Sequence, residues 1–133
     1  MYIRFVTPRV HPYSGRETGV FHTAYRLKYS GRLTDDEIDL LNELLSPYGD
    51  LEVPPVYRDE TIMQKRRDAA ICWFKTHSRQ MISHMYSVVA FLKFHGVPMA
   101  LLRTELPGRV LYEDEHQVAA VPYRRARHFK CWI

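Results

Sequence analysis

Cysteine, long apolar runs and catalytic motifs are scarce or missing in this 133-residue sequence. The two cysteines, Cys72 and Cys131, lie far apart and outside any C-x-x-C spacing, which excludes the disulfide framework of a small secreted domain. The most apolar stretch, residues 85–94, includes Lys93 and is far shorter than the roughly 20 residues that span a bilayer. The first ten residues lack the apolar region of a signal peptide. We therefore expect a cytoplasmic protein with no membrane segment.

Sequence signatures of the common enzyme classes are also absent. The chain has no G-x-S-x-G, no H-E-x-x-H, no glycine-rich phosphate loop and no Walker lysine. Two polar groups keep a small hydrolase open as the least favoured alternative. One surrounds His11 and His22 in an early loop, and the other is Glu113–His116. Either group would have to converge in a pocket to be catalytic, so we expect a non-enzymatic protein without a cofactor.

The acidic stretch Glu113–His116 and the seven histidines raise the question of a metal site. Side chains alternate between the two faces of a strand, so Asp114 would point away from Glu113 and Glu115. A solvated hairpin turn explains this stretch better than a metal or acid–base site. His77 and His84 would share a helix face but lie about 10 Å apart along its axis, too far to bind one ion. We expect no metal.

Hydrophobic periodicity predicts a single α+β domain over residues 1–133, with a mainly antiparallel sheet of about four to five strands and three helices packed largely on one face. The best local signal is the capping box of Thr34 and Glu37, which begins a helix that must end before Pro47. Residues 47–68 form a long connection without a clear period, and residues 123–133 form a basic tail. The expected strands cover residues 2–6, 69–75, 97–104, 109–114 and 117–123, and the other two helices cover residues 18–30 and 78–95.

Positive charge is concentrated at one place in the sequence. The chain has 19 Lys and Arg against 15 Asp and Glu, and the whole excess lies within residues 124–133. Basic residues attract the phosphate backbone, and aromatic side chains interleaved with them can stack on unpaired bases. We therefore expect nucleic-acid binding, either DNA or RNA, with Tyr123 and Phe129 stacking. The expected contacts come from Arg124, Arg125, Arg127, His128 and Lys130, with help from Lys65, Arg66 and Arg67.

Two other interpretations of the tail remain open. The basic residues would only keep the protein soluble if the final Cys131, Trp132 and Ile133 docked on the core or on a second subunit. Alternatively, the tail and an open sheet face would form a protein-interaction module for an acidic partner. A homodimer is also expected, because residues 117–123 are apolar on both faces of a strand and a second subunit would cover them.

Overall fold

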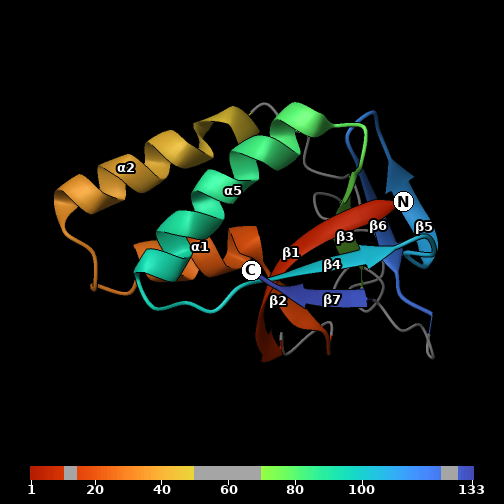
Figure 1. Cartoon of the computed structure of the whole chain (residues 1–133), viewed down its shortest axis with the longest axis horizontal. Helices are drawn as coiled ribbons and strands as arrows, with labels where there is room; N and C mark the ends of the chain where they lie inside the picture. The colour runs from red at the N-terminus through yellow and green to blue at the C-terminus, as the bar shows by residue number, and fades with distance from the viewer. Residues whose placement is uncertain (11–14, 50–69, 124–128) are drawn as a thin grey trace, which may run out of the picture.

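One antiparallel sheet and three α-helices make up the described part of the chain, which comprises residues 1–10, 15–49, 70–123 and 129–133 of the computed structural model (Figure 1). This confirms the α+β prediction and its three helices, but the sheet has seven strands instead of four to five. The elements follow in the order β1 (Tyr2–Val10), β2 (Glu17–Gly19), α1 (Val20–Lys28), α2 (Asp35–Leu45), the 3₁₀ turn η1 (Ser46–Tyr48), β3 (Ile71–Lys75), α5 (Arg79–Phe94), β4 (Ala100–Thr104), β5 (Arg109–Glu113), β6 (Gln117–Val121) and β7 (Phe129–Trp132).

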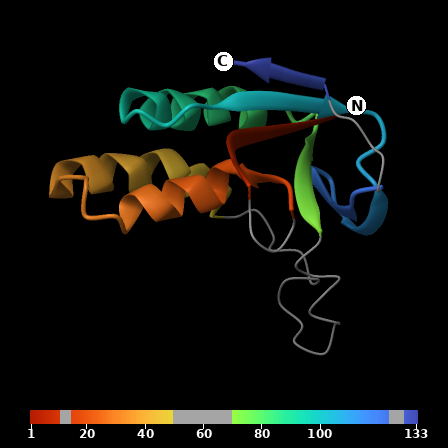
Figure 2. The ribbon, with the colours of Figure 1, turned by 90° about the horizontal axis from the view of Figure 1, so that it is seen from below.

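The strands are arranged in the order β5-β6-β3-β1-β4-β7, with β2 paired to the far end of β1. Every strand pair is antiparallel. The helices gather on one side of the molecule, while β5 and β6 lie on the other (Figures 1 and 2). Strands β5 and β7 therefore lie at the two ends of this order, and β2 is a further strand with a single neighbour within the described residues.

The two additional strands, β2 and β7, have no sequence signal of their own. Strand β2 is three residues of polar character, Glu17–Gly19, in a segment full of turn formers. It pairs with β1, which continues to Val10 through a register irregularity between Thr7 and Val10. The sequence predicted a strand over residues 2–6, and the observed strand is longer, because proline is tolerated in a strand at such irregularities.

Strand β7 comprises four residues, Phe129–Trp132, of the predicted tail 123–133. It pairs along β4, with Leu101 opposite Cys131 and Ala100 opposite Trp132. The backbone N–H of Ile133 donates to the carbonyl of Met99 at 3.2 Å, and the Ile133 side chain packs against the main apolar cluster. Four residues containing a lysine are too few for a strand to be recognised by alternation alone.

The helices pack on one face of the sheet and form the main apolar cluster. Phe5 of β1, Leu41 of α2 and Met85 of α5 are all buried there. The predicted capping box is confirmed: the Glu37 N–H donates to Thr34 Oγ1 at 3.2 Å and the Thr34 N–H donates to Glu37 Oε1 at 2.9 Å. None of the helices in the described ranges combines the length and the apolar character that a bilayer span requires.

The opposite face of the sheet is a second apolar cluster, and this corrects the expectation of an open face. Val6, Trp73, Leu102 and Val118 alternate along their strands with the residues that face the helices, and all four are at most 1% exposed. Arg4 lies on the same face, since it is opposite Leu102. This part of the sheet therefore offers no surface to a partner.

Strand β6 is also covered by its own chain. It lies between β5 and β3, with Ala119 opposite Cys72, and Val118, Ala119 and Ala120 are fully buried. The apolar character of residues 117–123 was taken to require a second subunit. That reason for a homodimer is removed for residues 117–120, because they are already buried within a single chain.

Candidate nucleic-acid interface

Only part of the predicted basic site lies in the described residues. Tyr123 and Lys130 are described completely, and Phe129 through its backbone pairing with Arg103. The predicted contacts that lie outside the described residues are Arg124, Arg125, Arg127, His128, Lys65, Arg66 and Arg67. We use the name β7 surface for Tyr123, Lys130 and Trp132 with Arg16 and Glu17.

The described residues that flank the basic segment 124–128 in the sequence contact the sheet on both sides. On one side, β6 ends at Val121, and the carbonyl of Tyr123 accepts a hydrogen bond from Arg16 Nη2 at 3.3 Å. On the other side, Phe129 and Lys130 pair with β4. The described residues on either side of the basic segment in the sequence are therefore both joined to the sheet.

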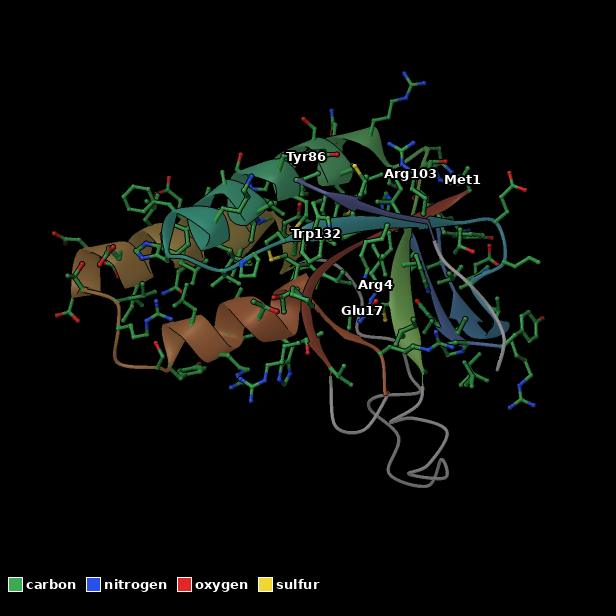
Figure 3. All side chains as sticks on the ribbon, turned by 60° about the horizontal axis from the view of Figure 1, so that its bottom comes forward. Met1, Arg4, Glu17, Tyr86, Arg103 and Trp132 are labelled. Atoms are coloured by element: carbon green, nitrogen blue, oxygen red, sulfur yellow. The ribbon has the colours of Figure 1, made fainter. Side chains whose placement is uncertain are left out.

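Lys130 is joined to Glu17 across the end of the sheet. Its Nζ lies 2.8 Å from Glu17 Oε1, although β7 and β2 are separated by β4 and β1 in the order of pairing. Figure 3 shows Glu17 beside Arg4. Partial burial raises the pKa of Glu17, but the hydrogen bond and charge of Lys130, with a contribution from Arg4, lower it below the usual value. Glu17 is therefore an ionised acceptor that competes with any other anion for Lys130.

Trp132 does not dock on the core with Ile133, which was one of the alternatives that the sequence left open. Docking of the last three residues accounts for Ile133 alone, because the Trp132 side chain stays 58% exposed. Lys130 and Trp132 are two residues apart in one strand and point to the same face, and Lys130 Nζ lies 5.9 Å from the centroid of the indole ring. The spacing of Lys130 and Trp132 by two residues could have predicted that they share a face. That prediction requires residues 129–132 to be recognised as a strand.

Tyr123 adds a second exposed aromatic side chain before the basic segment. It is 52% exposed, whereas most large apolar side chains of the sheet are buried. Exposed aromatic residues on both sides of a basic segment give stacking partners next to charge. From the predicted segment, the described residues bring Lys130 and Trp132 together, with Glu17 as a partner that the sequence did not indicate. Tyr123 contacts Arg16, the sequence neighbour of Glu17.

Residues 114–116 form the tight turn between β5 and β6, as expected for Glu113–His116. Asp114 accepts hydrogen bonds from the backbone N–H groups of His116 and Gln117 at 2.8 and 2.9 Å. It also accepts from Tyr112 Oη and Gln117 Nε2, both at 3.0 Å. Burial raises the pKa of Asp114, but these hydrogen bonds lower it below its usual value. This carboxylate organises the turn.

The same turn is tied to the start of α5 by two histidines. His116 Nδ1 lies 2.9 Å from Ser78 Oγ, and His77 Nε2 lies 2.8 Å from the carbonyl of Glu115. Ser78 is only 7% exposed, so its hydroxyl is held inside a structural joint between the hairpin and the helix. Of the two early-loop histidines, His22 lies in α1 and His11 falls outside the described residues. Glu17, which lies between them in the sequence, is paired with Lys130.

Metal-binding geometry is absent from the described ranges. There, no group of three or more His, Cys, Asp or Glu side chains is placed to hold an ion. His77 and His84 have separate partners, since His84 Nε2 lies 2.8 Å from the carbonyl of Leu44. Each imidazole is engaged with a backbone carbonyl of a different element.

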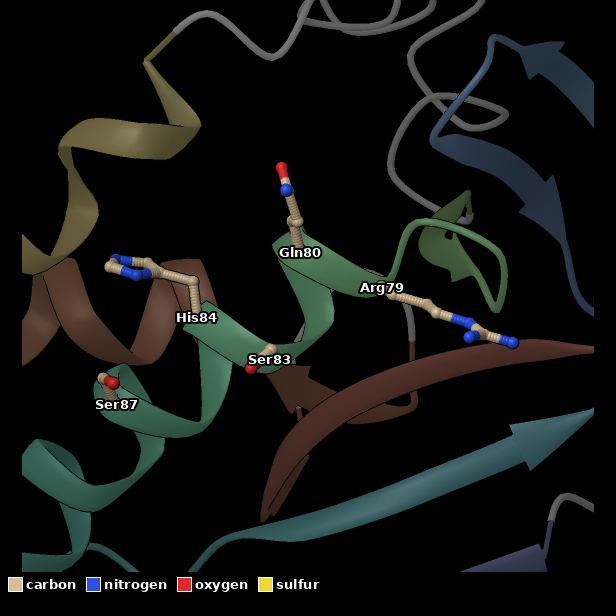
Figure 4. Close-up of a pocket in the computed structure, with 5 residues that line it drawn as sticks. All are labelled: Arg79, Gln80, Ser83, His84 and Ser87. Carbon is tan, nitrogen blue, oxygen red and sulfur yellow. The ribbon is translucent and has the colours of Figure 1, made fainter.

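A shallow depression of about 480 Å³ lies along the outer face of α5 (Figure 4). Its lining comes entirely from one helix and comprises Arg79, Gln80, Ser83, His84 and Ser87. The polar groups do not converge on a common point in Figure 4, where Gln80 and Arg79 point in different directions. This depression does not resemble an enclosed ligand site, which concentrates a few polar groups in an apolar cleft.

Comparison with known proteins finds no matching family model, no matching curated protein and no matching solved structure. The function must therefore be inferred from the chemistry of the surface itself.

Proposed function

We propose that this protein binds nucleic acid, DNA or RNA, through the β7 surface and the adjoining basic residues Arg124, Arg125, Arg127 and His128. The observation that carries the proposal is the pairing of β7 with β4, which attaches one end of the basic segment to the sheet beside an exposed Trp132. A basic segment with attached ends loses less conformational entropy on binding than a free tail.

Charge and exposure both favour a phosphate partner at this place. The excess positive charge of the chain lies within residues 124–133, and phosphate contacts supply most of the affinity in sequence-tolerant binding. Arginine suits such contacts because its planar guanidinium binds phosphate through two parallel hydrogen bonds. Lys65, Arg66 and Arg67 would extend the basic surface if segment 50–69 folds beside β7.

We also propose a cytoplasmic homodimer. Cys72 and Cys131 form no disulfide, as expected in a reducing compartment, and the strands at the two ends of the sheet order, β5 and β7, each have a single neighbour among the described strands. Dimerisation would double the number of phosphate contacts. Light scattering at micromolar concentration tests this part directly, and a monomer mass would refute it.

Fluorescence anisotropy with labelled DNA and RNA oligonucleotides at two salt concentrations tests the proposed function. The test variant changes Arg124, Arg125, Arg127 and Lys130 to glutamine. Its control changes four other exposed basic residues that lie on the helices and on β5, namely Arg26, Arg79, Lys93 and Arg109. Both variants have the same net charge, so any difference between them reports the location of the charge.

We expect the wild-type affinity to fall steeply with salt, by roughly tenfold or more between 50 and 200 mM. The test variant should lose most of the binding, while the control variant keeps more of it. Equal losses in both variants would mean non-specific attraction to a basic protein. Absence of binding at low salt, from a protein shown to be folded by circular dichroism, would refute the function and favour an acidic protein partner.

A further inference from the structure

We infer that the nucleic acid recognised by the β7 surface is single-stranded, with an unpaired base stacked on Trp132. This inference rests on the proposed function and narrows it to one class of substrate. The described residues that carry it are Trp132, Lys130, Glu17 and Tyr123. They combine the exposed ring of Trp132 with the ammonium group of Lys130, whose ion pair with Glu17 a phosphate would replace.

The exposure of Trp132 is the first argument. Its side chain is 58% exposed although it belongs to a strand of the sheet, whereas the other tryptophan, Trp73, is 1% exposed. Burial of an indole ring is strongly favourable, so an indole that the fold leaves in solvent has apolar area available for a ligand. Bases within a duplex already stack on one another, and only an unpaired base has a free face for the ring.

The position of Lys130 is the second argument. Its ammonium group lies 5.9 Å from the Trp132 centroid and 2.8 Å from Glu17, so charge and ring are adjacent. In a single strand, each nucleotide carries a phosphate close to its base. Two adjacent side chains, such as Trp132 and Lys130, can therefore contact the base and the phosphate together. Stacking on Trp132 would bring a backbone phosphate within reach of Lys130, where it competes with the Glu17 carboxylate.

Tyr123 is the third argument, because it gives a second stacking position before the basic segment. Its ring is 52% exposed, and its backbone is held by Arg16. Proteins that bind single strands combine a basic groove with successive aromatic side chains. Trp132 and Tyr123, with residues 124–128 between them in the sequence, match this combination.

The two tryptophans make the inference directly measurable. Trp73 is buried and Trp132 is exposed, so a base that stacks on Trp132 should quench the solvent-exposed part of the emission and leave the buried part unchanged. The titration uses full-length protein with matched 12-nucleotide oligomers, single-stranded oligo-dT and oligo-U and a DNA duplex, and records intrinsic fluorescence together with anisotropy. The variants are Trp132→Ala and Trp132→Phe. Phe94→Ala is the control, because Phe94 is 85% exposed at the end of α5.

We expect tighter binding of single strands than of the duplex, with quenching that disappears in Trp132→Ala. The affinity of Trp132→Ala for single strands should fall by roughly tenfold, and Trp132→Phe should recover part of it, while Phe94→Ala binds like wild type. Equal binding of duplex and single strand without quenching would refute this inference and leave the proposed function standing. If the wild-type protein binds none of the oligomers, both this inference and the proposed function are refuted.

Discussion

The two halves of the sheet on either side of β1 contain the same kinds of residue but use them differently. The half formed by β3, β6 and β5 has Trp73 fully buried and Lys75 paired with Glu113 at 2.6 Å. The half formed by β4 and β7 has Trp132 exposed and Lys130 paired with Glu17 at 2.8 Å. We call the first half the closed half, because packing buries its tryptophan and hydrogen bonds to Asp114 hold its turn. The second keeps an aromatic ring and a cation accessible beside a basic segment.

This comparison teaches that residue type alone does not separate a structural role from a binding role. A tryptophan and a lysine–glutamate pair occur in both halves, and their exposure and neighbours differ. The predictions below change one half at a time and use the other half as its control.

Removing the indole ring should have the largest effect on stability at Trp73 and a much smaller effect at Trp132. Trp73→Ala should lower the free energy of unfolding by about 3–5 kcal/mol, because it leaves a cavity in the second apolar cluster. Trp132→Ala should cost less than about 1 kcal/mol, since most of its surface already faces water. Urea denaturation followed by circular dichroism measures both. Similar losses for the two variants would contradict the assignment of Trp132 to an open surface.

The turn of the closed half should depend on the Asp114 carboxylate. Asp114→Asn should cost about 1–3 kcal/mol, because the carboxylate accepts four hydrogen bonds and an amide cannot replace all of them. Glu115→Gln is the neighbouring control, with a side chain 81% exposed, and should change stability by less than about 0.5 kcal/mol.

The lowered pKa of Asp114 predicts that the stability of the protein depends on pH. The folded-state pKa of this carboxylate lies below its ordinary value of 3.8. The stability that it contributes is therefore fully present above the unfolded pKa and is lost as the pH falls through the folded pKa. Unfolding at several pH values below 5 should show wild type converging toward Asp114→Asn. A difference that stays constant with pH would show that the ionised form of Asp114 has no special role.

The two lysine–glutamate pairs should contribute least to stability. Glu113→Gln and Glu17→Gln should each cost about 0.2–1 kcal/mol, since one or both partners are partly exposed and water screens the pair. The midpoint of urea unfolding at low and high salt measures this small contribution. A loss of several kcal/mol from Glu17→Gln would mean that Glu17 holds the fold together and does not serve as a replaceable partner of Lys130.

Sequence reasoning captured the elements whose signal is local. The capping box of Thr34 and Glu37 and the apolar periodicity of α5 predicted their helices closely, because hydrogen bonds and helical faces depend on residues three or four apart. The fold class followed from the same patterns. Strand β2 was missed because it is three polar residues long, and β7 was missed because four residues are too few to show alternation. Pairing with β1 and with β4 defines these two strands.

The candidate site was less predictable for a related reason. The basic segment and Tyr123 were visible as composition, but the contact of Lys130 with Glu17 joins residues 113 positions apart in the sequence. The exposure of Trp132 depends on which face of β7 it occupies, which only the pairing with β4 determines. The expectation of an open sheet face failed because Trp73 and Val118 pack into a second cluster there.

The most direct test of the central claim compares two variants that alter charge equally at opposite ends of the sheet. Glu17→Gln and Glu113→Gln each remove one negative charge and release one lysine, and binding of a single-stranded oligonucleotide is measured for both at low salt. If the β7 surface binds phosphate, Glu17→Gln should tighten binding by roughly three- to tenfold, because Lys130 is freed for one more contact. Glu113→Gln should then bind nearly like wild type. Equal tightening by both variants, or none by Glu17→Gln, would contradict the assignment of nucleic-acid binding to the β7 surface.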